Sequence, residues 1–134
     1  MSTKTKINPA EFVKSTTSAS VTTGSMEVAN NTGFTITYVS VEHCTSGCST
    51  VTLTTASMTN NTDAGPKSFT TGSGTDYWFV SFLDYNGNLC TGYTTLAYHS
   101  SDAGTTVEIS LQASQFVVAI GGRTSVGEYK QKDL

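Results

Sequence analysis

The feature that most constrains this fold is a run of aromatic and β-branched residues that ends in an Asn-Gly pair. It occupies residues 75–93, TDYWFVSFLDYNGNLCTGY, and holds the only tryptophan of the chain, Trp78. Such a run before Asn86 and Gly87 predicts a β-hairpin, because Asn and Gly tolerate the backbone angles of a tight turn. Alternate residues of a strand point to opposite faces, and both faces are apolar here. The run therefore predicts a central strand that is covered from two sides.

Other short segments are also predicted to be strands, at residues 26–30, 34–42, 50–56, 66–70, 105–111 and 116–120. Apolar and polar residues alternate in residues 50–56 and 105–111, whereas residues 116–120 are a continuous apolar run that suits a buried strand. The apolar positions of residues 34–42 change phase part-way, which predicts a β-bulge or a strand covered on both faces. Eight or nine short strands with turn residues between them predict an all-β fold, a single antiparallel β-sandwich of jelly-roll or immunoglobulin-like type.

The composition suggests three parts along the chain. Residues 1–24 form an N-terminal arm, residues 25–120 the β-sandwich domain, and residues 121–134 a polar C-terminal tail. Asn8 and Pro9 are suited to begin one turn of helix, in which the apolar side chains would dock on a surface. The residues of this assembly arm are Ile7, Phe12 and Val13. A disordered tail is the alternative for the same segment.

Charge argues against polyanionic partners. Only 13% of the residues are charged, the net charge is −3 and the pI is about 5.1, whereas nucleic-acid binding calls for a basic patch. Of the seven basic residues only Lys67 lies between Lys14 and Arg123. We therefore expect no nucleic-acid partner. The chain shows no apolar run long enough to span a membrane and no apolar signal-peptide core, which predicts a cytoplasmic protein or one exported by a non-classical route.

Three cysteines leave the redox state open. Cys44 and Cys48 flank a short loop with a glycine, so their Cα atoms can approach to the distance of a disulfide. Three reduced, partly buried thiols, with Cys90 the third, are the alternative expected of a cytoplasmic protein. His43 would add a fourth metal ligand, but zinc sites usually show paired CxxC or CxxH spacing. We expect neither a metal nor a cofactor.

Residues for catalysis are sparse. His99 and Asp102 lie in the turn YHSSDAG beside two serines, yet the chain has no GxSxG nucleophile elbow. No pair of carboxylates stands out for glycoside hydrolysis. The sequence therefore predicts a protein that is not an enzyme.

Aromatic residues on and beside the hairpin are the remaining candidates for a binding site. Tyr and Trp combine an apolar body with a polar edge, so they suit core packing, stacking on sugars and the headgroup region of a membrane. The candidate binding residues are Tyr77, Trp78, Tyr85, Tyr93 and Tyr98.

Three turn-rich segments resemble a known family. They are VANNTGFTI at residues 28–36, KSFTTGSGTDYWFVSF at residues 67–82 and AYHSSDAG at residues 97–104. Together they are similar to segments of the aegerolysins and related small insecticidal crystal proteins. The resemblance implies a β-sandwich that recognises membrane lipid, often as the smaller partner of a two-component pore-forming toxin. The single tryptophan and residues 1–24 depart from that family's pattern.

Three functions follow as expectations. The first is a lipid-binding β-sandwich that acts with a partner toxin subunit. The second is a structural subunit of a filament, coat or crystalline inclusion, since edge strands without lysine lack the usual protection against pairing with another copy. The third is a carbohydrate-binding module, because the aromatic residues could stack on sugars.

Overall fold

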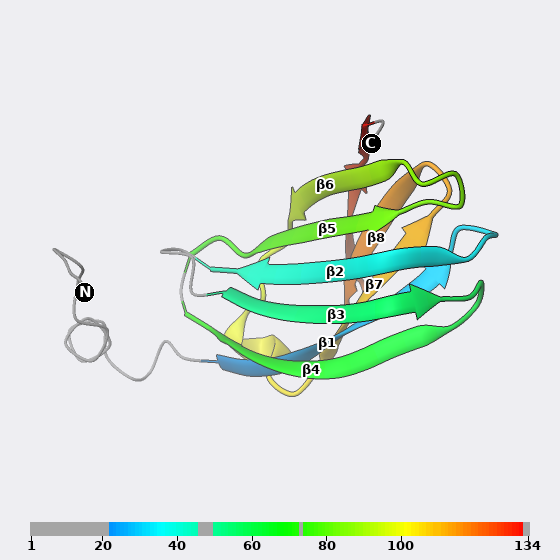
Figure 1. Cartoon of the computed structure of the whole chain (residues 1–134). Helices are drawn as coiled ribbons and strands as arrows, with labels where there is room; N and C mark the ends of the chain where they lie inside the picture. The colour runs from blue at the N-terminus through cyan, green and yellow to red at the C-terminus, as the bar shows by residue number, and fades with distance from the viewer. Residues whose placement is uncertain (1–21, 46–49, 73, 133–134) are drawn as a thin grey trace, which may run out of the picture.

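The protein folds as a two-layer β-sandwich, which confirms the predicted all-β class. The computed structural model describes residues 22–45, 50–72 and 74–132 (Figure 1). In chain order its strands are β1 (Thr22–Asn31), β2 (Ile36–Cys44), β3 (Thr50–Met58), β4 (Asp63–Thr71), β5 (Tyr77–Leu83), β6 (Leu89–Thr95), β7 (Thr106–Gln112), β8 (Gln115–Ile120), β9 (Arg123–Glu128) and β10 (Lys130–Lys132). One turn of 3-10 helix, η2 (Ser100–Asp102), lies between β6 and β7.

The strands form two five-stranded sheets. The first sheet has the order β4-β1-β7-β8-β9 and the second has the order β10-β6-β5-β2-β3. Every pair is antiparallel except β1 with β7, which is parallel. Strands β3 and β4 belong to different sheets but lie side by side at one edge of the sandwich (Figure 1).

The core lies between the sheets and is built from alternate residues of the strands. Val107, Ile109 and Leu111 of β7 all point inward, as the alternation in that segment predicts. The largest buried apolar side chains are Trp78, Phe69, Phe116, Met26, Ile36, Ile109, Leu111 and Ile120. Burial of an aliphatic or aromatic side chain contributes about 1.5–3 kcal/mol, so this set supplies the main drive for folding.

The hairpin of residues 75–93 is confirmed, but its expected burial on both faces is wrong. Strand β5 pairs with β6 in antiparallel register and lies at the centre of the second sheet. Its Trp78, Val80 and Phe82 face the core, whereas Tyr77 and Phe79 face outward. A two-layer sandwich covers each sheet on one side only, so the second apolar row of β5 lies on the surface.

The change of phase in β2 is a β-bulge, one of the two predicted explanations. The register between β2 and β5 shifts between Thr37 and Ser40. Tyr38 sits in the bulge with φ at 51°, a left-handed conformation that is uncommon for a non-glycine residue. The bulge turns the Tyr38 side chain outward, where it is 71% exposed, and returns Val39 to the core.

The predicted division of the chain needs correction at its C-terminal end. Residues 121–134 were expected to be a polar tail, but β9 pairs with β8 and β10 pairs with β6. The sequence of β9 lacks an apolar residue at its buried position, which is Gly127, so the alternation typical of a strand is not visible there. An added Cβ at Gly127 would lie 2.3 Å from the ring of Phe116. The ring of Phe116 therefore fills the space of an apolar side chain. At the other end β1 already begins at Thr22, and the assembly-arm residues Ile7, Phe12 and Val13 lie outside the described residues.

A partly exposed ion pair fastens β9 to the segment after β6. The guanidinium of Arg123 contacts the carboxylate of Asp102 and also donates to the carbonyl of Ala97 at 2.9 Å. Partial desolvation raises the pKa of the Asp102 carboxyl, but the backbone N–H of His99 and the Arg123 guanidinium outweigh this effect. The net result is a pKa below the usual value for an aspartate. The pair therefore stabilises the fold while Asp102 is ionised.

Replacement of Arg123 by methionine is expected to lower the free energy of unfolding by about 1 kcal/mol near neutral pH, a small loss because the pair is partly exposed. A carboxyl with a lowered pKa contributes stability above its unfolded-state pKa and loses it on acidification. The difference between wild type and Arg123→Met should thus shrink below about pH 4, as measured by urea denaturation across pH. Lys130→Met, which removes an exposed cation, is the control. An effect of Arg123→Met that is constant with pH would contradict this account.

Candidate functional site

The main candidate site is a pocket at one end of the sandwich, here called the end pocket. It encloses about 300 Å³ and is lined by Thr32, Phe34, Ile36, Phe82, Asp84, Tyr85, Cys90, Ala113, Ser114 and Tyr129. These residues come from the β1–β2, β5–β6 and β7–β8 loops, from the strands beside them and from the junction of β9 and β10. The pocket therefore opens between the two sheets, where the loops of both meet.

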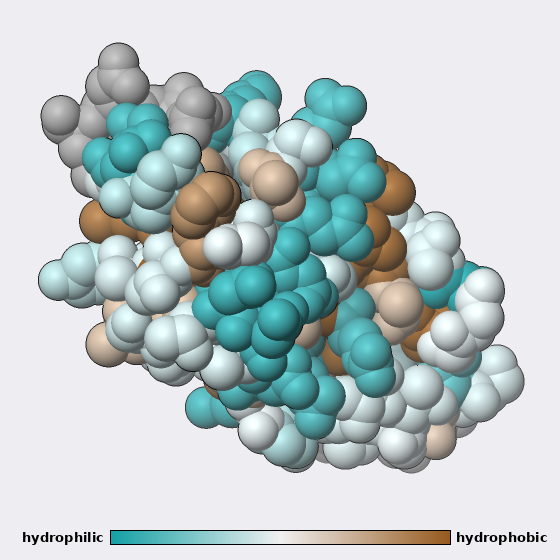
Figure 2. Space-filling model, turned by 90° about the vertical axis from the view of Figure 1, so that its right-hand side faces the viewer, coloured by the Kyte–Doolittle hydropathy of each residue, from teal (hydrophilic) through white to brown (hydrophobic). Residues whose placement is uncertain are grey.

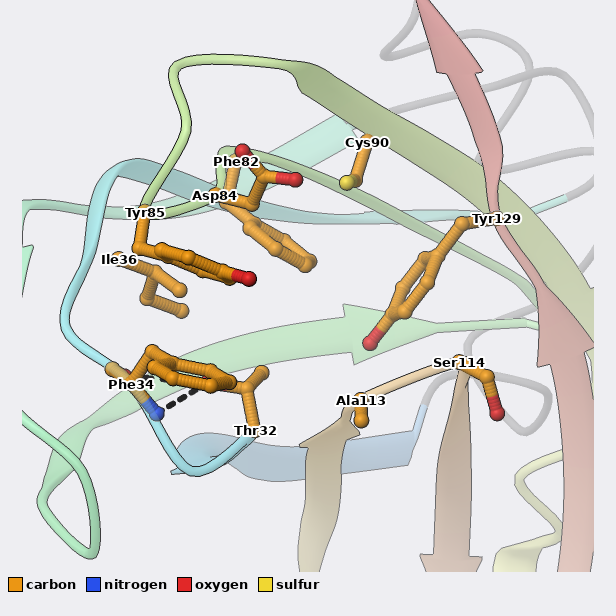
Figure 3. Close-up of a pocket in the computed structure, with 10 residues that line it drawn as sticks. All are labelled: Thr32, Phe34, Ile36, Phe82, Asp84, Tyr85, Cys90, Ala113, Ser114 and Tyr129. Carbon is orange, nitrogen blue, oxygen red and sulfur yellow. Dashed lines mark hydrogen bonds between the residues drawn. The ribbon is translucent and has the colours of Figure 1, made fainter.

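Two exposed aromatic rings form one wall of the end pocket, and we refer to Phe34 and Tyr85 as the aromatic pair. Their ring centroids are 4.1 Å apart and their planes differ by 20°, so the rings stack. Phe34 is 49% exposed and Tyr85 is 60% exposed. In Figure 3 the two rings lie one above the other, with Tyr129 across the cavity. The pair thus presents apolar surface to solvent at the tips of two loops.

Buried Asn30 holds Phe34 in place. Its side-chain amide donates to the carbonyls of Phe34 at 2.7 Å and Met58 at 2.9 Å, and its side-chain oxygen accepts from the N–H of Thr32 at 3.0 Å. Its backbone N–H donates to the carbonyl of Thr62 in the β3–β4 turn. One side chain with no solvent exposure therefore connects the β1–β2 turn to the end of β3. Satisfied buried amides of this kind rigidify the loops around them.

Asp84 orders the loop that carries Tyr85. Its Oδ1 accepts from the backbone N–H groups of Asn86 and Asn88, both at 2.9 Å, and its carbonyl accepts from Gly87. Gly87 has φ at 82°, so this turn uses the conformational freedom that Asn-Gly predicts. Both members of the aromatic pair therefore stand on hydrogen-bonded turns.

Tyr129 forms the opposite wall of the end pocket. Its ring packs edge-on against Phe82 at 5.1 Å and lies parallel to Phe116 at 5.9 Å, and its hydroxyl donates to the carbonyl of Gln112. Burial raises the pKa of the Tyr129 hydroxyl, so this phenol stays protonated and neutral. Among the described lining residues Asp84 is the only charged one, and none is basic.

A second surface lies on the outer side of the second sheet, and we call it the outer aromatic face. It consists of Tyr77 and Phe79 of β5 and Tyr93 of β6, with ring centroids 5.6–6.4 Å apart. Phe79 and Tyr93 are directly opposite each other in the strand register. The three rings border a broad, shallow hollow that Thr91, Thr95, Glu128 and Lys130 complete.

The arrangement that most resembles a catalytic group is sealed in the core. The Nε2 of His43 lies 2.7 Å from Oδ2 of Asp76, and both residues are fully buried. The hydroxyl of Thr71 donates to the same carboxylate at 2.6 Å, and the N–H of Tyr98 donates to its other oxygen at 2.9 Å. The His43 ring packs against the rings of both Phe69 and Trp78. These contacts stabilise the carboxylate and leave no room for a substrate beside the imidazole.

The remaining polar candidates occupy structural positions. His99 is exposed and directly precedes η2, and its backbone N–H donates to Oδ2 of Asp102 at 2.7 Å. Cys44 is disulfide-bonded, whereas Cys48, the partner predicted for it, lies outside the described residues. Cys90 points into the end pocket from β6. Across residues 22–45, 50–72 and 74–132, no three or more His, Cys, Asp or Glu side chains gather as a metal site would require.

The five aromatic residues predicted to bind separate into three groups. Tyr77 and Tyr93 lie together on the outer aromatic face, and Tyr85 belongs to the aromatic pair. Trp78 and Tyr98 are buried: the indole N–H of Trp78 donates to the carbonyl of Leu96, and the hydroxyl of Tyr98 lies within 2.7 Å of the carbonyls of Asp102 and Thr105. These two therefore present no ring face to a ligand.

Sequence reasoning missed Phe34 and Phe79, the partners of the predicted tyrosines. Phe34 directly follows the Asn-Thr-Gly turn, which is where a side chain is displayed at a loop tip. Phe79 lies two residues after Tyr77 and shares its face. Both signals are visible in the sequence, but the stacking of Phe34 on Tyr85 joins residues from separate hairpins and requires the fold.

No protein-family model matches the chain, and no curated protein matches its sequence. Among the described residues, no helix is long and apolar enough to cross a membrane.

Replacement of Asn30 by alanine is expected to lower the free energy of unfolding by about 3 kcal/mol, because two carbonyls and one N–H lose their buried partner. The change should also release the Phe34 loop. Urea denaturation measures the first effect, and the NMR line widths of the Phe34 ring measure the second. Asn31→Ala is the matched control, since the exposed Asn31 side chain makes one bond, to Ser110. Equal stability losses in the two variants would contradict the role given to Asn30.

Proposed function

We propose that this protein is a non-enzymatic module that docks on a membrane surface through the loop end of its sandwich. The observation that carries the proposal is the aromatic pair, an exposed Phe-Tyr stack at the mouth of an apolar pocket formed by loops. The further role of a small component in a pore-forming toxin system rests on the sequence resemblance alone.

The chemistry of the loop end suits the headgroup region of a bilayer. Phe34 supplies an apolar ring, and Tyr85 supplies a ring with a polar hydroxyl, the combination favoured at membrane interfaces. Figure 2, which views this end, shows hydrophilic residues across its middle with hydrophobic side chains to either side. The loops there are rich in uncharged Asn, Thr and Gly, as at residues 30–33 and 59–62. Rings inserted to the depth of the headgroups would leave such polar loops in contact with water.

The charges of this end favour neutral or zwitterionic lipid. Asp84 lines the end pocket and Asp63 begins β4 at the same end, whereas the described lining residues include no basic side chain. Anionic lipids attract proteins through Lys and Arg clusters, and two carboxylates would instead be repelled. Binding should therefore depend on apolar contact and vary little with salt.

A binding role, rather than a catalytic one, is supported by the location of the titratable groups. The His43–Asp76 pair is buried and its oxygens are occupied by donors from the protein. The end pocket combines aromatic and aliphatic side chains with Asp84, whose Oδ1 is engaged by the loop backbone.

Vesicle sedimentation tests the proposal. Wild-type protein should sediment with phosphatidylcholine or sphingomyelin vesicles more strongly than with phosphatidylserine vesicles, and 0.5 M salt should change its binding to the phosphatidylcholine and sphingomyelin vesicles little. Phe34→Ser should weaken binding about 10-fold, since the loss of a half-buried aromatic contact corresponds to about 1.4 kcal/mol.

Tyr93→Ser is the matched control for Phe34→Ser, because it also removes an exposed aromatic ring but from the outer aromatic face. It should leave vesicle binding unchanged. Failure to sediment with any of the three vesicle types, or equal losses for Phe34→Ser and Tyr93→Ser, would refute docking through the loop end.

Self-association is a second candidate, favoured by the edge of the second sheet. Strand β3 pairs with β2 on one side, and on its other side β4 lies beside it without forming a hydrogen-bonded strand pair among the described residues. Residues 50–58 contain neither a charged residue nor a proline, the usual protections of an edge strand. Strand β4, the edge of the first sheet, carries both Pro66 and Lys67.

Light scattering coupled to size-exclusion chromatography tests self-association. If copies pair through β3, Thr54→Lys should reduce the molar mass to that of a monomer, because a lysine on the edge opposes strand addition. Thr23→Lys places the same side chain on β1, an inner strand of the first sheet, and should have no effect. A wild-type protein that is monomeric at every concentration would exclude this second function.

A further inference from the structure

We propose that the outer aromatic face is a separate binding site for a neutral oligosaccharide of pyranose rings. The site lies on the surface of β5 and β6, away from the end pocket, and shares no lining residue with it. It therefore does not depend on the membrane-docking role proposed above.

The geometry of the three rings suits stacking on sugars. The planes of Tyr77 and Phe79 differ by 18°, and Tyr93 is inclined to them by 43° and 34°. Together they make an open, gently concave surface rather than an enclosed slot. The equatorial hydroxyls of a glucose-type pyranose leave its C–H bonds on two flat apolar faces, and such a face is attracted to an aromatic ring.

Hydroxyl groups surround the rings at the positions where a sugar presents its edge. Thr95 lies opposite Tyr77 in the register of β5 and β6. Thr91 lies opposite Ser81, two residues from Tyr93 and on the same face of β6. Within the described part of the chain, the hydroxyls of Tyr77, Thr91, Tyr93 and Thr95 make no hydrogen bond to protein. These hydroxyls, on residues that are exposed or partly exposed, can donate to and accept from sugar hydroxyls without breaking an internal bond.

The charges around this face favour an uncharged glycan. Glu128 and Lys130 lie at its edge, and Glu42 of β2 is paired with Phe79. The described charges therefore give the face a slight negative balance, which would repel sulfated or sialylated sugars.

The size of the face argues for a glycan over a second copy of the chain. Phe79 is 36% exposed and Tyr93 is 58% exposed, so three rings of 150–250 Å² each offer about 300 Å² of aromatic surface. A stable protein interface buries about 800 Å² on each partner. The remainder of the face is Thr, Ser and charged side chains, which add hydrogen-bonding capacity but little apolar area.

NMR titration of the full chain with cellohexaose and with chitohexaose, at millimolar concentrations, tests the inference. At least one of these should shift amide signals of β5 and β6. Tyr93→Ser should weaken that binding about 10-fold or more, the loss expected for removal of one stacking ring. Tyr93→Phe keeps the ring and should retain most of the affinity, which separates stacking from a general effect on folding.

Two controls keep the sites distinct. Val126→Ser removes an exposed apolar side chain from the first sheet, and Phe34→Ser alters the end pocket. Both variant proteins should bind the oligosaccharide as tightly as the wild type does. The inference is overturned if neither oligosaccharide shifts β5 and β6, if Tyr93→Ser binds unchanged, or if a heparin hexasaccharide binds more tightly than the neutral sugars. A dimer that Tyr93→Ser abolishes would identify the face as an interface between copies and overturn it as well.

Discussion

The packing of the two sheets depends on the buried carboxylate of Asp76. Its donors come from both sheets, with the Thr71 hydroxyl at the end of β4 and the His43 ring in β2, and from the Tyr98 N–H beyond β6. A carboxylate removed from water is stable only when such donors surround it. Asp76 therefore constrains how the chain crosses between the sheets, and the Phe69 and Trp78 rings pack around this polar centre.

At the loop end of the sandwich a second buried polar side chain has a comparable role. Asn30 connects the β1–β2 turn with the end of β3, while Asp84 closes the β5–β6 turn. Because these bonds are made within the protein, the aromatic pair is held in position before any ligand arrives. Pre-organised side chains lose less conformational entropy on binding, so the membrane docking proposed for Phe34 and Tyr85 would cost less ordering of their loops.

A single hairpin supplies residues to both candidate surfaces. Its tip carries Tyr85 to the end pocket, and its outer side carries Tyr77, Phe79 and Tyr93 to the outer aromatic face. Its inner side supplies Trp78 and Phe82 to the core. The aromatic residues of 75–93 are thus divided between the core and the two candidate surfaces, and the direction of each side chain decides to which of them it belongs.

The sequence by itself determined part of the local structure: the hairpin at Asn86-Gly87 and the alternation in β7 follow from propensities and side-chain periods that act over a few residues. For β2 it left a bulge and burial on both faces as alternatives, and the structure decided for the bulge. Only the tertiary structure decided which of two apolar rows is buried, because that depends on whether a second layer covers each face. It placed Phe79 outside and Trp78 inside, revealed β9 through the packing of Phe116 on Gly127, and stacked Phe34 on Tyr85. These contacts join residues distant in sequence, and no local pattern encodes them.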